Sequence, residues 1–147
     1  MITVVWGDIF KAQRDALVVP VNIIGTMGAG LAREVALRYP DAYRAYRAVC
    51  DSGELRIGTL ALLDWMHPKL LLFPTKGHWR EKSTLETIEC GLVELCRYED
   101  RLASLAIPAL GCGLGGLRWQ DVLPLMTNCL QGMTIPVDIY KPGWSRR

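Results

Sequence analysis

Short apolar runs separated by helical patterns are the feature that most limits the folds open to this chain of 147 residues. Each run is close to the four to eight residues of a buried strand, and most contain β-branched residues. The runs lie at residues 2–6, 16–21, 59–63, 70–73, 104–107 and 137–140. Strands that alternate with helices favour a layered α/β domain with a largely buried sheet, and a chain of this length holds one such domain.

Helical patterns fill the gaps between these runs. They are expected at residues 31–39, 41–50, 84–98 and 121–132. In the third, apolar residues recur from Leu85 to Leu95 at the spacing of one buried helix face. The letters STLE predict a capping box that starts at Ser83, and Asp121 is the candidate cap of the fourth helix.

Composition and charge exclude several classes of protein. The five cysteines form no CxxC pair, so we expect reduced thiols, no metal and no cofactor. No apolar stretch approaches the roughly 18 residues of a membrane span, and no basic leader precedes an apolar one. We therefore expect a cytoplasmic monomer with no membrane partner. The net charge of +2 neither demands nor excludes a nucleic-acid partner.

Two glycine-rich segments each follow a predicted strand, where α/β folds bind their ligands. They read VNIIGTMGAGLA at 21–32 and IPALGCGLGGLRW at 107–119. Glycine lets backbone N–H groups approach an anion, and a helix N-terminus adds about half a positive charge. A tight turn explains either loop alone equally well. Two loops in equivalent positions favour a ligand with two phosphates.

A lysine follows another predicted strand, in the segment FPTKGHWREKS at 73–83. Positive neighbours and desolvation would lower the pKa of Lys76 and free an amine able to attack a sugar carbon. A solvated surface lysine is the alternative, and the residues alone leave both interpretations open.

Four motifs together resemble those of macrodomains, which are ADP-ribose-binding modules. They are GDIF at 7–10, VNxxGxMGxGLA at 21–32, PTKxHWR at 74–80 and PALGCGxGGLxW at 108–119. PTKxHWR is the specific part. This motif resembles that of the macrodomain branch that contains the terminal ADP-ribose protein glycohydrolase and the DarG antitoxin. The DarG antitoxin removes ADP-ribose from thymidine bases in DNA. The resemblance implies one three-layer α/β/α macrodomain over residues 1–147, with a central mixed, mostly parallel six-stranded sheet and a cleft for ADP-ribose.

The resemblance also implies roles for individual residues. Asp8 would accept a hydrogen bond from the adenine amino group, although a turn residue after a strand is the alternative. Lys76 matches the lysine on which the branch depends. The first loop would hold the distal ribose and the second the diphosphate. The implied ADP-ribose-binding residues are Asp8, Ile9, Asn22, Gly25, Thr26, Met27, Gly28, Gly30, Leu31, Thr75, Gly111, Cys112, Gly113, Leu114, Gly115 and Gly116. His78, Trp79 and Arg80 would form a rim for the modified group, or else a packed tryptophan in a basic turn.

The implied reaction is attack of the Lys76 amine on the anomeric carbon of the distal ribose, with thymidine in single-stranded DNA as the preferred acceptor. The alternatives are removal of ADP-ribose from Glu or Asp side chains of proteins, a reader that binds ADP-ribose without turnover, and a phosphatase. The human-type glycohydrolase has an aspartate where this chain has Gly115, so the general acid or base is unassigned. These residues also hold no counterpart of the region with which DarG engages its toxin. We expect a stand-alone enzyme or only the catalytic part of a longer protein.

Overall fold

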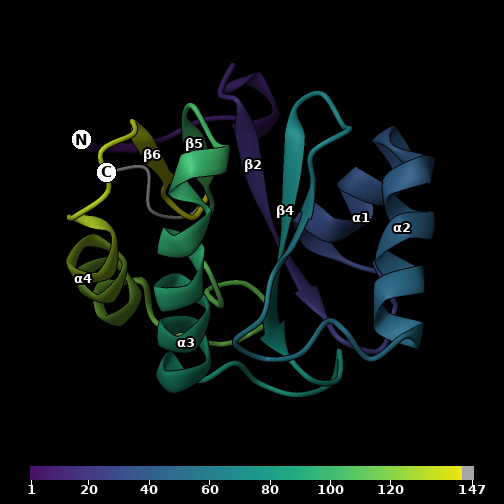
Figure 1. Ribbon diagram of the computed structural model, residues 1–147. Helices are drawn as coiled ribbons and strands as arrows, with labels where there is room; N and C mark the ends of the chain where they lie inside the picture. Colours follow the sequence, from purple (N-terminus) through teal and green to yellow (C-terminus); the bar gives the residue numbers. More distant parts are fainter. Residues whose placement is uncertain (144–147) are drawn as a thin grey trace.

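The computed structural model describes residues 1–143, which form one mixed sheet between two pairs of helices (Figure 1). The strands are β1 (Ile2–Val5), β2 (Ala16–Asn22), β3 (Ala61–Leu63), β4 (Lys69–Lys76), β5 (Leu105–Ile107) and β6 (Val137–Tyr140). Their order across the sheet is β1-β6-β5-β2-β4-β3. Only the β3–β4 pair is antiparallel among these described strands. The predicted six-stranded, mostly parallel sheet is confirmed.

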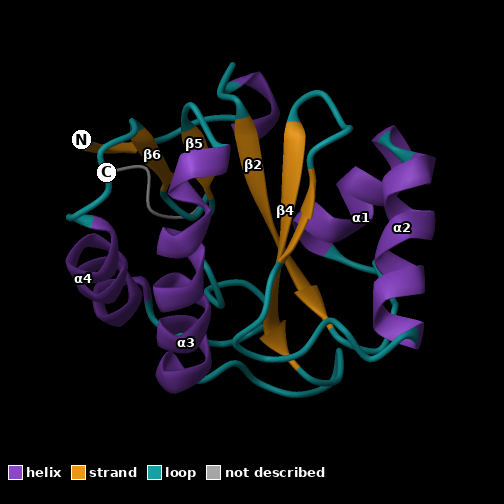
Figure 2. Cartoon of the chain, in the orientation of Figure 1, coloured by secondary structure: helices purple, strands orange, loops and turns teal. Residues whose placement is uncertain are grey.

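Two helices cover each face of the sheet, which gives the expected three layers (Figure 2). The helices are α1 (Gly30–Arg38), α2 (Pro40–Asp51), α3 (Leu85–Leu95) and α4 (Trp119–Leu130), with short 3₁₀ turns η1 (Ile9–Lys11) and η2 (Cys96–Arg101). The pair α1 and α2 packs on one face, and α3 and α4 pack on the other. Residues 144–147 of the predicted domain lie outside the described residues.

Strand β2 shows why the apolar runs predicted buried strands. Ala16 and Val18 point into the core beneath α3 and α4, whereas Leu17 and Val19 point into the core beneath α1 and α2. Successive strand residues face opposite sides of a sheet. A strand buried on both faces therefore reads as a continuous apolar run.

Both predicted helix caps were wrong. Thr84, not Ser83, caps α3, because its side chain accepts a hydrogen bond from the Thr87 N–H at 3.1 Å. Ser83 is buried instead, and its N–H donates to the Gly115 carbonyl at 2.9 Å. Helix α4 begins at Trp119, so Asp121 lies within its first turn and pairs with Arg118.

Neither disulfides nor a metal site is found among residues 1–143. All five cysteines are free thiols. In the described part of the chain, no three His, Cys, Asp or Glu side chains gather as a metal site would require. No helix within residues 1–143 has the length and apolar character needed to cross a membrane.

Candidate functional site

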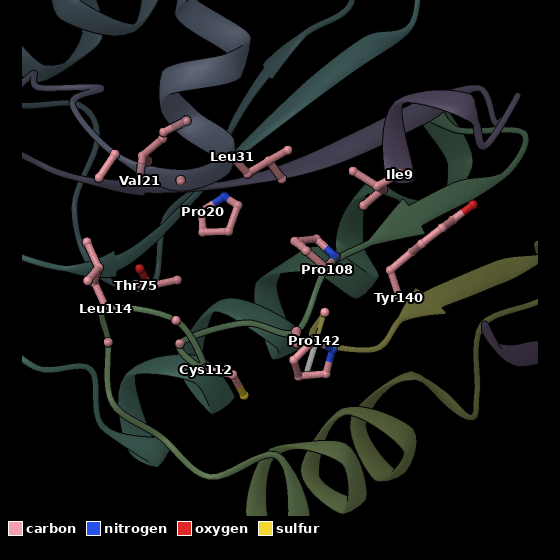
Figure 3. A pocket seen from close by; sticks show the side chains of 18 of the residues that line it. Ile9, Pro20, Val21, Leu31, Thr75, Pro108, Cys112, Leu114, Tyr140 and Pro142 are labelled. Carbon is pink, nitrogen blue, oxygen red and sulfur yellow. The ribbon is translucent and has the colours of Figure 1, made fainter. Parts of the chain in front are cut away.

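A cleft of about 830 Å³ opens where the five parallel strands end. Its lining includes residues that directly follow or end each of these strands, from Gly7 after β1 to Tyr140 at the end of β6. Figure 3 shows side chains from these strand ends and from both glycine loops around one cavity. The volume is within the range of about 300–1,000 Å³ that is typical of small-molecule sites.

Most of the predicted site residues come together in this cleft. Those that line it are Asp8, Ile9, Asn22, Thr26, Gly28, Gly30, Leu31, Thr75, Lys76, Trp79, Gly111, Cys112, Gly113, Leu114 and Gly115. Gly25, Met27, Gly116, His78 and Arg80 do not line it. Met27 is only 4% exposed and belongs to the core beside α1 and α2, so its side chain packs in the core and not in the cleft. Gly25 and Gly116 have φ of +93° and +80°, and so supply turns at the loops.

The first loop ends at an open helix N-terminus. Ala29 occupies the N-cap of α1 without a side-chain hydrogen bond. The first N–H groups of a helix have no intrahelical partner, so those of Gly30 and Leu31 remain available beside the cleft. Helix N-termini of this kind bind anions, because donors and the helix dipole point the same way.

The second loop presents a row of free backbone donors. Within residues 1–143, the N–H groups of Gly113, Leu114 and Gly115 make no hydrogen bond. The loop is closed behind them by the Leu117 N–H, which donates to the Gly111 carbonyl at 2.9 Å. Such consecutive donors suit the oxygens of a phosphate group.

Gly115 has no space for a side chain. A Cβ atom there would lie 2.6 Å from the Gly111 carbonyl oxygen and 2.6 Å from Ser83 Oγ. Both distances are far below a real contact distance, and the Gly111 oxygen belongs to the backbone. The aspartate of the human-type glycohydrolase therefore does not fit this loop, which accounts for the departure found in the sequence.

The end of the cleft at β1 and β6 is apolar with one carboxylate. Ile9 and Tyr140 lie on the same side of the cavity (Figure 3). Asp8 caps η1 through Oδ1, which accepts from the Phe10 N–H at 3.0 Å, and its other oxygen is left for a ligand. Sequence reasoning missed Tyr140. Its place at the carboxyl end of a predicted strand was the available signal.

Lys76 is the last residue of β4 and lines the cleft together with residues of both glycine loops. Asn22, the last residue of β2, is its partner in the sheet, after a register shift at Val21. The Lys76 Nζ donates to the Trp79 carbonyl oxygen at 3.1 Å. Burial lowers the pKa of Lys76, the nearby Lys82 lowers it further, and Glu81 acts in the opposite direction. The lowered pKa predicted from the sequence is confirmed.

The turn after Lys76 carries an exposed aromatic side chain, that of Trp79. Trp79 is 47% exposed and lines the cleft. The His78 and Trp79 ring centroids are 5.2 Å apart, and the Arg80 guanidinium lies 4.6 Å from the Trp79 centroid. Glu81 braces the turn, because its carboxylate accepts from the Gly77 N–H at 3.2 Å.

Other candidates for acid, base or nucleophile are few in the cleft. Burial raises the pKa of the Cys112 thiol to about 11, which makes it a poor nucleophile. Asp8 is the one carboxylate among the lining residues of the described chain, and it lies at the β1 end. Lys76 is thus the group best suited to covalent chemistry.

Comparison with known proteins identifies the fold. Residues 18–126 match the family model described as the Macro domain. The chain belongs to the macrodomain family.

Named relatives of this macrodomain include bacterial proteins. A DNA ADP-ribosyl glycohydrolase of Mycobacterium tuberculosis is 40% identical over all of this chain and 44% of its own length. The macrodomain of Mycobacterium tuberculosis DarG superposes with a TM-score of 0.91 at 39% identity, covering 97% of this chain and 98% of that one. DarTG of Thermosipho africanus in complex with ADP-ribose superposes at 0.94 and 39% identity, covering 99% of this chain and 43% of that one. This macrodomain spans less than half the length of the bacterial relatives named as DNA ADP-ribosyl glycohydrolases or their fusion proteins.

Proposed function

We propose that this macrodomain is an ADP-ribosyl hydrolase that removes ADP-ribose from thymidine in single-stranded DNA, with Lys76 as its nucleophile. The observation that carries the proposal is the position of Lys76: it ends a strand, it lines the cleft together with both donor-rich loops, and its pKa is lowered. The similarity to a DNA ADP-ribosyl glycohydrolase of Mycobacterium tuberculosis supports the choice of reaction and acceptor. We propose further that the enzyme is monomeric and cytoplasmic.

The cleft gives each part of ADP-ribose a place. Asp8 and Ile9 would hold adenine, the N–H groups of Gly113, Leu114 and Gly115 would bind the diphosphate, and the Asn22 side would hold the distal ribose. This order follows the cavity from β1 to the β2–β4 pair. It leaves the distal ribose beside Lys76, which is the sheet partner of Asn22.

The reaction divides into two displacements at the anomeric carbon. The neutral Lys76 amine forms a C–N bond to that carbon, the bond to the acceptor breaks, and the amine proton passes to the released acceptor. Water then adds to the lysyl intermediate, the C–N bond breaks, and free ADP-ribose leaves. Lysine suits this role because a neutral amine forms a Schiff base with a ring-opened sugar.

The acceptor would approach across Trp79. An exposed indole beside the amine suits stacking on a nucleobase, worth about 1–3 kcal/mol per base. Arg80 and Lys82 in the same turn supply positive charge for neighbouring phosphates.

Release of ADP-ribose from a single-stranded oligonucleotide modified at thymidine tests the function. We expect release by the unaltered chain, loss of at least about a thousandfold in rate for Lys76→Ala, and no change for Lys11→Ala, an exposed lysine outside the cleft lining. Free ADP-ribose should still bind Lys76→Ala, as measured by calorimetry.

A second substrate separates the alternatives. Release from a glutamate-modified protein but not from DNA would move the acceptor to protein side chains. Binding of ADP-ribose without release from either substrate would leave a reader module. Full activity of Lys76→Ala would exclude the lysine mechanism.

A further inference from the structure

Tyr46 is buried behind the first loop, where its hydroxyl is hydrogen-bonded to the cleft residue Asn22. It lies on α2, contributes nothing to the cleft lining and is 0% exposed. Its hydroxyl lies 2.6 Å from Asn22 Oδ1 and 2.8 Å from the Asn22 carbonyl oxygen, both of which accept. Burial raises the pKa of Tyr46 well above its ordinary value, so the phenol keeps its proton and remains a donor.

The contacts around Asn22 settle which way its amide points. Oδ1 also accepts from the N–H groups of Ile24 at 3.2 Å and Thr26 at 3.3 Å, while Nδ2 donates to the Thr26 carbonyl at 2.8 Å. Backbone N–H groups only donate and carbonyl oxygens only accept, so the reversed amide would lose all of these bonds. With three donors on Oδ1, the polar capacity left to Asn22 is the second N–H of its amide.

We propose that Tyr46 is a positioning residue for the distal ribose, because it fixes the Asn22 amide so that a donor faces the cleft. Asn22 and Lys76 both line the cleft and are partners at the ends of neighbouring strands, so a ligand group that reaches Lys76 also comes near Asn22. The ribose oxygens are the natural acceptors for the amide donor of Asn22. The inference rests on the proposed function, since it requires ADP-ribose as the ligand.

The effect of Tyr46 should be confined to one part of the ligand. Loss of the Tyr46 hydroxyl leaves Oδ1 with two weaker donors, the N–H groups of Ile24 and Thr26. The amide and the first loop can then shift. The contacts proposed for adenine and for the diphosphate come from η1 and the second loop, and within residues 1–143 no hydrogen bond joins either of them to α2. Loss of the hydroxyl should therefore weaken recognition of the ribose and leave recognition of ADP intact.

Titration of Tyr46→Phe with ADP-ribose and with ADP, which lacks the distal ribose, tests this inference. We expect the affinity for ADP-ribose to fall about tenfold, as for loss of one buried hydrogen bond, and the affinity for ADP to stay unchanged. In an Asn22→Ala background, the Tyr46→Phe change should have no further effect on ADP-ribose binding.

Tyr43→Phe is the matched control. Tyr43 lies on the same helix with its ring 6.3 Å from that of Tyr46, and its hydroxyl makes no hydrogen bond within residues 1–143. An equal fall for both ligands would mean that Tyr46 merely supports the fold, and would overturn the inference. Unchanged ADP-ribose affinity in Tyr46→Phe would overturn it while leaving the proposed function standing. Failure of the unaltered chain to bind ADP-ribose would overturn both.

Discussion

Charges beside Lys76 act on the one amine that the proposed reaction needs neutral. Lys82 lowers the pKa of Lys76 and Glu81 raises it, although burial is the larger cause of the shift. The two neighbours lie in the same exposed turn, so each can be neutralised without disturbing the core. The pair therefore offers a way to tune the nucleophile in opposite directions.

The pH dependence of kcat/KM should move in opposite directions in two variants. Activity rises with pH as the amine loses its proton. Lys82→Met removes a charge that lowers the pKa of Lys76, so its activity should rise only at higher pH. Glu81→Gln removes a charge that raises this pKa, so its activity should rise at lower pH, while the amide oxygen can still accept from Gly77. Glu86→Gln, exposed on α3, is the control. Shifts in the same direction would contradict the assignment.

Individual site residues differed in how far the sequence could predict them. Lys76 was found because its motif follows a strand and belongs to a known branch. Tyr46 carried no such signal, because its contact with Asn22 joins residues 24 apart through the packing of α2 on the sheet. The burial of Met27 was not predictable, since a loop position does not say which side chain turns into the core.

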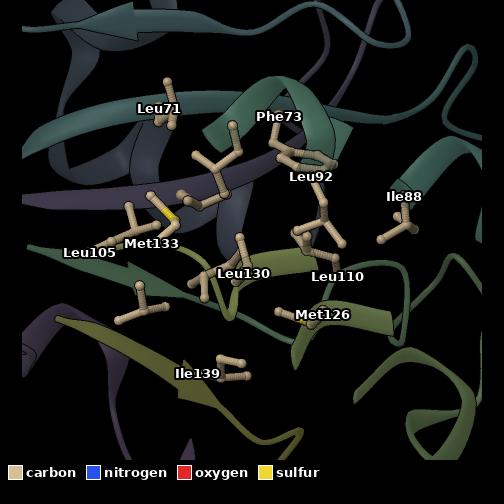
Figure 4. Close-up of a cluster of buried hydrophobic side chains, with 14 of the residues drawn as sticks. Leu71, Phe73, Ile88, Leu92, Leu105, Leu110, Met126, Leu130, Met133 and Ile139 are labelled. Carbon is tan, nitrogen blue, oxygen red and sulfur yellow. The ribbon is translucent and has the colours of Figure 1, made fainter. Parts of the chain in front are cut away.

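Helix α3 packs so closely on β4 that one position admits only glycine. A Cβ atom at Gly91 would lie 2.2 Å from the Phe73 ring, and Phe73 is fully buried. Figure 4 shows Phe73 beside Leu92 in the core cluster beneath this helix. The contact sets the height of α3 above the strand that ends in Lys76.

Gly91→Ala should lower the free energy of unfolding by about 1–3 kcal/mol, because overpacking of the core outweighs the gain of about 1 kcal/mol from better helix propensity. Urea denaturation followed by circular dichroism measures it. Gly132→Ala is the matched control, since no atom lies within 4 Å of its Cβ position. Stability equal to or above that of the unaltered chain would show that Phe73 moves aside freely.

The elements were predictable because their signals are local. Apolar runs marked every strand, although β4 continues to Lys76 through Thr75, which the run ending at Phe73 did not include. The helix caps were not predictable, because Ser83 is held by a hydrogen bond to Gly115, a residue distant in sequence. Local patterns give elements, while long-range contacts decide their ends.

The molecule as a whole carries a net charge of only +2, so binding to DNA should depend on a few cations near the cleft. Arg80 and Lys82 are the cations of the turn that bears Trp79. If each contacts one phosphate, neutralising both should make the plot of log affinity against log salt less steep by about 1.4, at about 0.7 for each phosphate of a single strand.

Binding of an unmodified single-stranded oligonucleotide between 50 and 200 mM salt, roughly the range over which such contacts weaken, measures this slope. Arg80→Met with Lys82→Met is compared with Arg97→Met, a cation in η2 at the opposite end of α3. A slope unchanged in the double variant would mean that this turn meets no phosphate.

The order of the strands in the sheet was not predicted from the sequence, and it has a consequence for folding during synthesis. β1 pairs only with β6 among the described strands, so β1 cannot join the sheet until β6, the last of these strands to be synthesised, has formed. Once β5 and the loop after it have been synthesised, the nascent chain contains both glycine loops and Lys76. Asp8 and Tyr140 can line the same cleft only after β6 has emerged. Domains fold as units during translation. Under the proposed function, the adenine end of the cleft is therefore completed by β6, and a chain interrupted before β6 would carry Lys76 without that end of the site.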